Sequence, residues 1–234
     1  MSQLLNLSDL ESQLASLSAE EGLKLVADLF PGKVVFSTSL GQEDQVITQL
    51  IASQKLSIQI FSLDTGRLFP ETLELLSRTE SKYKTRIKVY YPETASVEKL
   101  VEDIGINGFY ESVENRKSCC FVRKVAPLKR ALAGNAVWVT GLRAEQSANR
   151  SEMKRIEWDE ANQIIKYNPL LDWTFDQMIS YIEEQKIPYN PLHNQGFISI
   201  GCAPCTRAIL PGEDARAGRW WWEDSKKECG LHSK

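Results

Sequence analysis

The stretch VVFSTSLGQED, residues 34–44, decides the fold of this 234-residue chain. Its first three residues predict a short buried strand, and the apolar residues within 46–51 recur at the spacing of one helix face. Small hydroxyl residues and a single glycine lie between them, a composition typical of a loop that leads into a helix. A strand followed by such a loop and a helix is the repeating unit of α/β proteins.

The same alternation continues along most of the chain. The expected strands cover residues 34–36, 58–63, 87–90, 137–140, 155–158 and 164–167, the last two joined by a polar turn. The expected helices cover 46–51 and 97–104, follow Cys120, and begin at Pro70 and at Thr174. This order predicts the α/β class, with a mainly parallel sheet and helices on both faces. Ligands of such sheets bind beyond the carboxyl ends of the strands.

We expect a single domain with appendages at both ends. The first residues predict two short helices packed on the core, because Ser8–Glu11 and Ser18–Glu21 both fit the capping-box pattern. The three expected parts are the N-terminal helices (1–32), the central α/β region (33–212), which we expect to carry the ligand sites, and a cysteine-bearing C-terminal tail (213–234).

Composition and charge exclude several classes of protein. The formal net charge is −3, whereas general nucleic-acid binders carry a basic surface. No apolar run approaches the roughly 20 residues that span a bilayer, and Met1–Asn6 does not resemble the start of a signal peptide. We therefore expect a cytoplasmic protein that binds neither nucleic acid nor membrane.

Polar residues follow three of the expected strands. The loop after the first strand has hydroxyl groups and backbone N–H groups that suit an anion, although a plain helix cap and turn is the alternative. An acid and a base follow the second strand, and an arginine suited to an oxyanion follows the fourth. These candidate substrate-binding residues are Ser37, Thr38, Ser39, Gly41, Asp64, Gly66, Arg67 and Arg143.

Five cysteines carry the most specific information. They are Cys119, Cys120, Cys202, Cys205 and Cys229. An odd number without an export signal does not indicate a disulfide scaffold. Four of them form two close pairs and one stands alone, so we expect a metal site and a separate reactive thiol.

The spacing within the two pairs bears on the kind of metal site. The Cys202–Cys205 motif, C-x-x-C, suits zinc, a redox dithiol or an iron–sulfur cluster. The tandem pair Cys119-Cys120 fits a single tetrahedral ion poorly, but neighbouring thiolates can reach different irons of a cubane. This favours a [4Fe-4S] cluster over zinc, with buried unliganded cysteines as a further alternative.

Other residues near the cysteines have both a functional and a structural interpretation. Cys229 has His232 nearby, which favours a reactive thiolate, and an inert tail cysteine is the alternative. Basic residues around the cysteines predict a small polyanionic ligand. We interpret Arg116 and Lys117 as a solvated helix face, 220–222 as packing anchors and His193 as structural. The remaining basic residues near the cysteines are Arg123, Lys124, Arg207, Arg216 and Arg219.

Together these motifs resemble the assimilatory adenylyl-sulfate reductases, the iron–sulfur branch of the phosphoadenylyl-sulfate reductase family. The resemblance runs from about residue 33 to the end of the chain. It rests on Cys119-Cys120, GCAPCTR (201–207), GRWWWE (218–223) and ECGLH (228–232), supported by LDTGR (63–67) and GLR (141–143). The loop after the first strand has fewer glycines than the phosphate loops of related nucleotide-binding folds.

The resemblance implies a fold of the adenine nucleotide alpha hydrolase (PP-loop) type and a two-step reaction. Cys229 would attack the sulfur of adenosine 5′-phosphosulfate, forming an S-sulfonate and releasing AMP. Thioredoxin or a glutaredoxin-like dithiol from another protein would then release sulfite. The two cysteine pairs would hold one [4Fe-4S] cluster, and Lys124, Arg216, Arg219 and His232 would contact the substrate.

Three alternatives stay open. The protein is a reductase of the 3′-phosphorylated nucleotide or of both nucleotides, a sulfurtransferase acting on tRNA, or a zinc-stapled binding module. Modest basic content and the absence of a tRNA-binding extension speak against the sulfurtransferase. Homo-oligomer formation is also left open.

Overall fold

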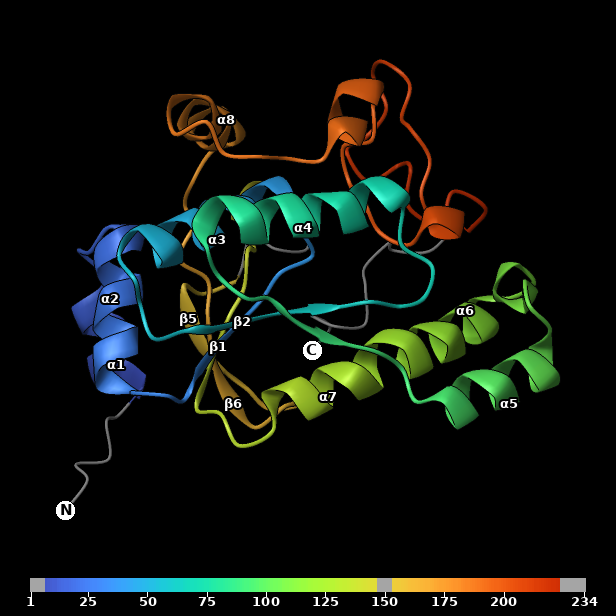
Figure 1. The fold of residues 1–234 in the computed structure, drawn as a ribbon, viewed down its shortest axis with the longest axis horizontal. Coiled ribbons are helices and arrows are strands. Elements are labelled where there is room, and N and C mark those ends of the chain that lie inside the picture. Colours follow the sequence, from blue (N-terminus) through green and yellow to red (C-terminus); the bar gives the residue numbers. More distant parts are fainter. Residues whose placement is uncertain (1–6, 147–152, 224–234) are drawn as a thin grey trace.

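The computed structural model describes residues 7–146 and 153–223 (Figure 1). The helices are α1 (Leu7–Leu14), α2 (Ala19–Leu29), α3 (Gln42–Ser53), α4 (Pro70–Tyr83), α5 (Thr94–Ile104), α6 (Val113–Cys120), α7 (Ala126–Leu132) and α8 (Phe175–Glu184). The strands are β1 (Val34–Ser37), β2 (Gln59–Leu63), β3 (Lys88–Tyr90), β4 (Val137–Val139), β5 (Ile156–Asp159) and β6 (Ile164–Tyr167).

The strands form one sheet in the order β3-β2-β1-β4-β6-β5. All neighbouring pairs are parallel except β5 and β6, which are antiparallel. The predicted mainly parallel sheet is therefore confirmed. The chain builds outward from β1 to β3 and then returns to place β4 beside β1, so the strand order reverses between these two strands. In open α/β sheets such a reversal leaves a crevice at the carboxyl ends.

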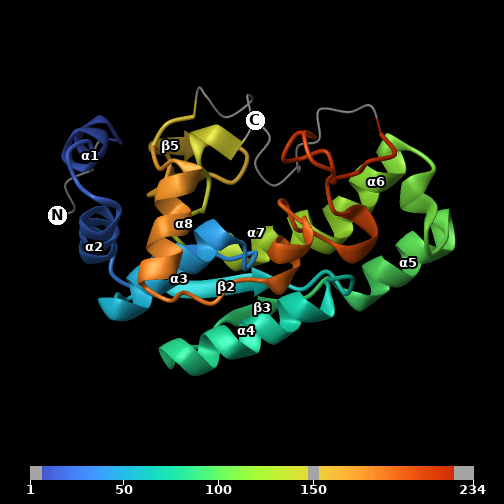
Figure 2. The ribbon, with the colours of Figure 1, turned by 90° about the horizontal axis from the view of Figure 1, so that it is seen from above.

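Successive residues of each strand point to opposite faces of the sheet, and both faces are buried. Val34 and Phe36 of β1 belong to a large apolar core that includes residues from α1, α2, α3 and α8, whereas Val35 packs with Leu128 and Leu132 of α7. Figure 1 shows α3 and α4 on one side of the sheet and α7 on the other, and Figure 2 looks onto the α3 and α4 side. The prediction of helices on both faces is confirmed.

The two N-terminal helices pack on this main core through residues such as Leu10, Leu14 and Leu23. The predicted capping box at Ser18 and Glu21 forms at the start of α2. The one predicted at Ser8 is wrong, because α1 already begins at Leu7 and Ser8 lies within its first turn.

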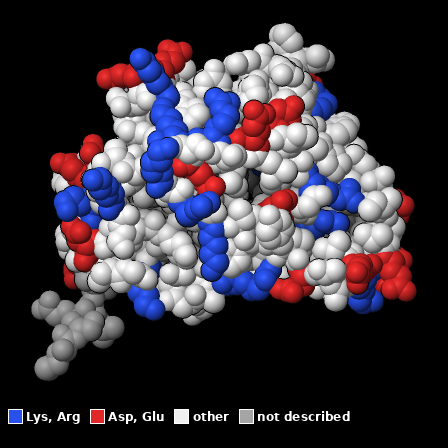
Figure 3. Space-filling model, in the orientation of Figure 1, with Lys and Arg blue, Asp and Glu red and all other residues white. Residues whose placement is uncertain are grey.

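No helix in the described part of the chain is long and apolar enough to cross a membrane. Figure 3 shows Lys and Arg side chains interspersed with Asp and Glu side chains over the visible face.

A close approach between α2 and β6 gives a test of this packing. A methyl group on Gly22 would collide with the hydroxyl oxygen of Tyr167, which is buried and has no hydrogen-bond partner among the described residues. We expect Gly22→Ala to lower the free energy of unfolding by about 1–3 kcal/mol, the usual cost of overpacking. In a Tyr167→Phe background the loss should be smaller, because the colliding oxygen is gone.

Urea unfolding of the four proteins in this double-mutant cycle measures the coupling. An equal loss in both backgrounds would contradict the packing described here.

Candidate active site

A cavity of about 530 Å³ opens at the carboxyl ends of β1, β2 and β4, where the strand order reverses. This volume lies within the range of small-molecule sites. The structure brings together at this cavity Ser37, Thr38, Ser39, Gly41, Lys124, Arg143, Arg216 and Arg219, all predicted as substrate-binding residues.

The polar groups of the loop after β1 form hydrogen bonds within the protein. The Thr38 N–H donates to the Phe61 carbonyl (2.8 Å), and the Leu40 N–H donates to the Thr38 hydroxyl (3.0 Å). The N–H and hydroxyl groups of Ser39 both donate to the carboxylate of Asp44, at 2.6 and 2.7 Å. Each of these three backbone N–H groups therefore already has an acceptor within the protein in this conformation.

Asp44 takes the position that an anion would otherwise occupy in this loop. Its side chain is buried, and burial raises the pKa of the carboxyl group to about 7 despite the hydrogen bonds from Ser39. A side chain at Gly141 would collide with this carboxylate. The absence of a side chain at Gly141 therefore lets the loop after β4 close against the start of α3.

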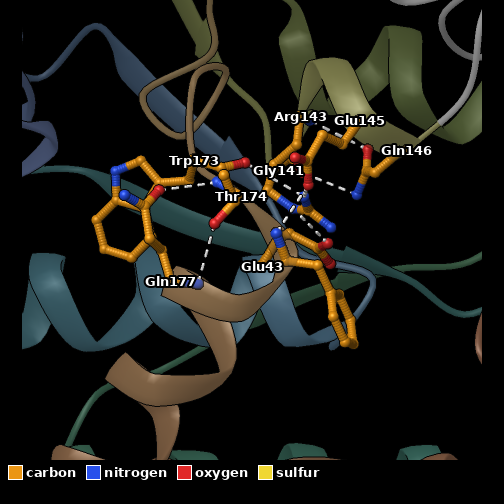
Figure 4. Close-up of polar contacts among 9 residues, drawn as sticks. Glu43, Gly141, Arg143, Glu145, Gln146, Trp173, Thr174 and Gln177 are labelled. Carbon is orange, nitrogen blue, oxygen red and sulfur yellow. Dashed lines mark hydrogen bonds and ion pairs between the residues drawn. The ribbon is translucent and has the colours of Figure 1, made fainter.

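Arg143 lies at one end of the cavity and is fully engaged by the protein (Figure 4). Its guanidinium group donates to Glu43 (2.9 Å), Glu145 (3.2 Å) and the carbonyl of Trp173 (3.2 Å). Glu145 also accepts from the backbone N–H of Phe175 at the start of α8. Arg143 thus ties the loop after β4 to α3 and α8, and its charge is balanced by two carboxylates.

The opposite side of the cavity is lined by three further cations. Lys124, Arg216 and Arg219 line it, and a methyl group on Gly201 would collide with the guanidinium group of Arg219. The Arg219 Nε atom is buried and has no hydrogen-bond partner within the described residues. This side of the cavity is therefore suited to an anionic group.

A second, smaller cavity contains both cysteine pairs. Cys119 and Cys120 end α6, and Cys202 and Cys205 flank a short 3₁₀ turn at 203–205. All four cysteines are free and at least half-buried. The cavity is also lined by four cations: Arg67, Arg116, Arg123 and Lys124.

The two cavities share the residues Lys124 and Cys202. Lys124 lies in a π-helical turn, Phe121–Val125, that follows directly on Cys120. Such turns are rare overall, but those that occur are often found at functional sites. The sequence predicted Lys124 as a substrate-contacting cation near the cysteines, and the structure places it at this boundary.

The thiols differ in acidity because their surroundings differ. Burial raises the pKa of Cys202, but the charge of Lys124, a hydrogen bond with Thr65 (3.3 Å) and further cations outweigh it, so the net shift is downward. Burial and the charge of Cys202 raise the pKa of Cys205 to about 12. Two neighbouring buried thiolates repel each other, so both thiols ionise only when a cationic group lies between them.

The positions of the four thiols bear on the kind of metal group that would fit between them. Within residues 7–146 and 153–223, no three His, Cys, Asp or Glu side chains converge as closely as one metal ion requires. A cubane does not require that convergence, because its four thiolate ligands bind different irons. The Nε atom of Arg123, which lines the same cavity, is also buried without a partner in the described chain. Four thiols that line one cavity together with cations, one of which has an unsatisfied donor atom, fit a cluster.

Several predicted residues lie elsewhere. Asp64, Gly66 and Arg67 are not among the residues lining the large cavity: Asp64 accepts from the Gly66 N–H within its own turn, and Arg67 faces the cysteine cavity. Cys229 and His232 lie outside the described residues.

One structural interpretation of a single residue needs revision. Arg116 is buried and paired with Glu223, so the expectation that it lies on a solvated helix face is wrong. His193, interpreted as structural, lies in the wall of the large cavity. Among residues 220–222, expected as packing anchors, Trp220 is buried whereas Trp221 is exposed.

Comparison with known proteins identifies the family of this site. Residues 33–208 match the model of the phosphoadenosine phosphosulfate reductase domain. The chain belongs to this family. The family resemblance noted in the sequence is thereby confirmed, and the match favours a reductase over the sulfurtransferase and the zinc-stapled module.

The relatives of this reductase-family chain carry a consistent name. A protein of Allochromatium vinosum named adenosine 5′-phosphosulfate reductase is 57% identical over 202 residues, which cover 86% of this chain and 79% of that protein. A protein of the same name from Sinorhizobium fredii is 54% identical over 224 residues, covering 95% and 89%.

Solved structures extend the comparison. The crystal structure of phosphoadenylyl-sulfate reductase from Candida auris, in complex with phosphate, has a TM-score of 0.75 and 29% identity, covering 89% of this chain and 98% of that one. An FMN adenylyltransferase from Candida glabrata (TM-score 0.55, 14% identity, 95% and 76% covered) shares the fold alone. The fold is of the adenine nucleotide alpha hydrolase type, as expected.

Part of the cavity wall of this reductase domain comes from residues that the sequence did not indicate. Thr140 follows β4 directly, and Asn190, Ile198 and Ser199 come from the segment before the second cysteine pair. Thr140 could have been found from its place at a strand end. The others lack a local signal, because they reach the cavity only through the packing of a long irregular segment.

The raised pKa of Asp44 gives a test by pH. The folded protein holds this proton more tightly than the unfolded chain, where the pKa is near 3.8. Its contribution to stability is therefore full at acidic pH and is lost as the pH rises through 4 to 7. Asp44→Asn removes the titration, so the stability of the variant relative to wild type should increase between pH 5 and pH 8, by up to about 2.6 kcal/mol.

Urea unfolding at several pH values measures this difference. Replacement of the exposed Asp172 by Asn is the matched control and should show no such trend. A difference for Asp44→Asn that does not change with pH would contradict the buried carboxyl group described here.

Proposed function

We propose that this protein is an adenylyl-sulfate reductase, which converts adenosine 5′-phosphosulfate to AMP and sulfite in assimilatory sulfate reduction. The observation that carries the proposal is the shared boundary of the two cavities. Lys124 and Cys202 line both, so a nucleotide-sized cavity with cations on one side adjoins four thiols. The names of relatives at 50–57% identity support this substrate.

The proposed orientation of the substrate follows from charge. The phosphosulfate group is anionic, so it is best placed on the side of Lys124, Arg216 and Arg219. The side that holds Glu43 and Asp44 would repel it. These cations would offset the repulsion between a thiolate and an anionic sulfate group, which otherwise opposes attack.

The proposed nucleophile is Cys229. Its thiolate attacks the sulfur atom of the substrate, an S–S bond forms, the bond from sulfur to the bridging oxygen breaks, and AMP leaves with both electrons of that bond. A thiolate of thioredoxin or a glutaredoxin-like protein then attacks the Cys229 sulfur and expels sulfite. The second thiol of that partner resolves the mixed disulfide, so the partner supplies the two electrons of the reduction.

We further propose that Cys119, Cys120, Cys202 and Cys205 hold one [4Fe-4S] cluster. The fit of four free thiols and nearby cations in one cavity supports it. The cluster would supply a fixed charge distribution beside the substrate, not the electrons of the reaction. Thiols that stay reduced are typical of a reducing compartment, so the proposal includes a cytoplasmic location.

The intermediate can be detected directly. Anaerobically purified protein mixed with adenosine 5′-phosphosulfate, without reductant, should gain the mass of one SO₃ group on Cys229, because the second step lacks its thiol. Mass spectrometry of the intact protein and of its peptides measures this gain. Cys229→Ser should gain nothing, and thioredoxin should remove the adduct.

The same measurement with the 3′-phosphorylated nucleotide decides between single and dual substrate use. Wild-type protein that never gains this mass from either nucleotide would contradict the proposed reaction.

The cluster has an independent test. We expect about four irons and four acid-labile sulfides per chain, and a loss of both in Cys202→Ser, because a serine hydroxyl is a poor iron ligand. Colorimetric iron and sulfide analysis measures this, with Cys229→Ser as the control that keeps them. Zinc without sulfide would contradict the cluster and favour the zinc-stapled alternative.

A further inference from the structure

Arg116 and Glu223 form a buried, two-point ion pair between distant parts of the chain. The Nε and Nη2 atoms of Arg116 each donate to one carboxylate oxygen of Glu223, both at 2.9 Å. The two side chains are only 5% and 3% exposed. Arg116 lies on α6, one turn before Cys119, and Glu223 lies six residues before Cys229.

The residues next to Glu223 also make several contacts with the rest of the protein. The ring of Trp220 is fully buried and lies within cation–π distance of two guanidinium groups, those of Arg116 (4.6 Å) and Arg219 (4.7 Å). The backbone N–H of Trp220 donates to the carbonyl of Cys205 (3.2 Å), and the backbone N–H of Glu223 donates to the Trp220 carbonyl (3.0 Å). The segment 219–223 is therefore bound to both cysteine motifs at once.

The backbone in this segment is also strained. Trp220 has φ of 42°, in the left-handed region that bulky residues avoid. Such a conformation persists only where the surroundings determine it strongly, and it is most common at functional sites. The contacts of Arg116 and Glu223 hold the backbone of Trp220 in this conformation.

The energetics of buried ion pairs indicate a geometric role. Desolvation offsets most of the attraction in such a pair, so an apolar pair of similar volume often gives equal or greater stability. A two-point guanidinium–carboxylate pair does, however, fix the relative position and orientation of the two elements it joins. Here the elements are the helix that ends in Cys119-Cys120 and the segment that leads to Cys229.

We propose that Arg116 is a positioning residue: through Glu223 it sets the point from which the chain continues to Cys229, and so aligns that thiol with the substrate cavity. This inference rests on the proposed function of Cys229. Arg219, which lines the large cavity and contacts Trp220, belongs to the same anchored segment. The pair thus links the cysteine site to both the substrate cations and the nucleophile.

The test uses two conservative variants, Arg116→Lys and Glu223→Gln, and their double variant. Lys117→Ala, an exposed cation on the same helix, is the matched control. The four measurements are iron per chain, the Kd for AMP, hydrogen exchange at the amides of Trp220 and Glu223, and the single-turnover rate of SO₃ adduct formation on Cys229.

We expect both single variants to keep iron and AMP affinity within twofold of wild type. Amide exchange in 219–223 should rise at least tenfold, and adduct formation should slow at least tenfold. The double variant should be no slower than the slower single variant, because both changes break the same pair. The Lys117→Ala control should match wild type in every measurement.

Two results would overturn the proposal. Unchanged exchange and an unchanged adduct rate would show that the pair positions nothing. Iron loss in step with the adduct rate would assign Arg116 to the cysteine site alone. Wild-type protein that forms no adduct would instead refute the role of Cys229, and hydrogen exchange would still decide whether the pair anchors the segment.

Discussion

The functional region depends on one constraint, which is that cations and thiols are enclosed together in one small cavity. Arg67, Arg116, Arg123 and Lys124 line the cavity that holds the four paired cysteines. Buried charges are stable only when they are paired or hydrogen-bonded. The protein satisfies part of this requirement with a carboxylate and with backbone carbonyls, and it leaves the buried Nε atom of Arg123 without a partner in the described chain. A group that accepts hydrogen bonds and carries negative charge completes such an arrangement.

The large cavity has a division of charge that follows from the same requirement. At one side Arg143 is balanced by Glu43 and Glu145, and Asp44 occupies the donors of the loop after β1. At the other side the cations face the cavity next to Cys202. The polar groups that hold the strand ends together are therefore separate from those suited to a ligand, and this separation orients an anionic substrate in the proposed reaction.

Much of the fold and part of the site could be predicted from local patterns. Apolar runs and helical spacing located each strand and most helices, and the alternation of the two predicted the parallel sheet. The exceptions have specific causes. The hydroxyl loop at 37–41 suggested an open anion site, but nothing local indicated that Asp44, at the start of the next helix, would fold back onto it. Arg116 looked solvent-exposed because its partner lies 107 residues away.

By itself the sequence determined the α/β class, the division of the cysteines into two close pairs and a separate fifth one, and the family. These features depend on periodicity and on residue types at short spacing. Only the tertiary structure decided that the two cysteine pairs share a cavity, that Lys124 lies on its boundary with the larger one, and that Arg143 is already neutralised by carboxylates. The physical reason is that burial and charge pairing depend on distances in space. Those distances are set by how the sheet brings separate strand ends and loops together, which no local pattern encodes.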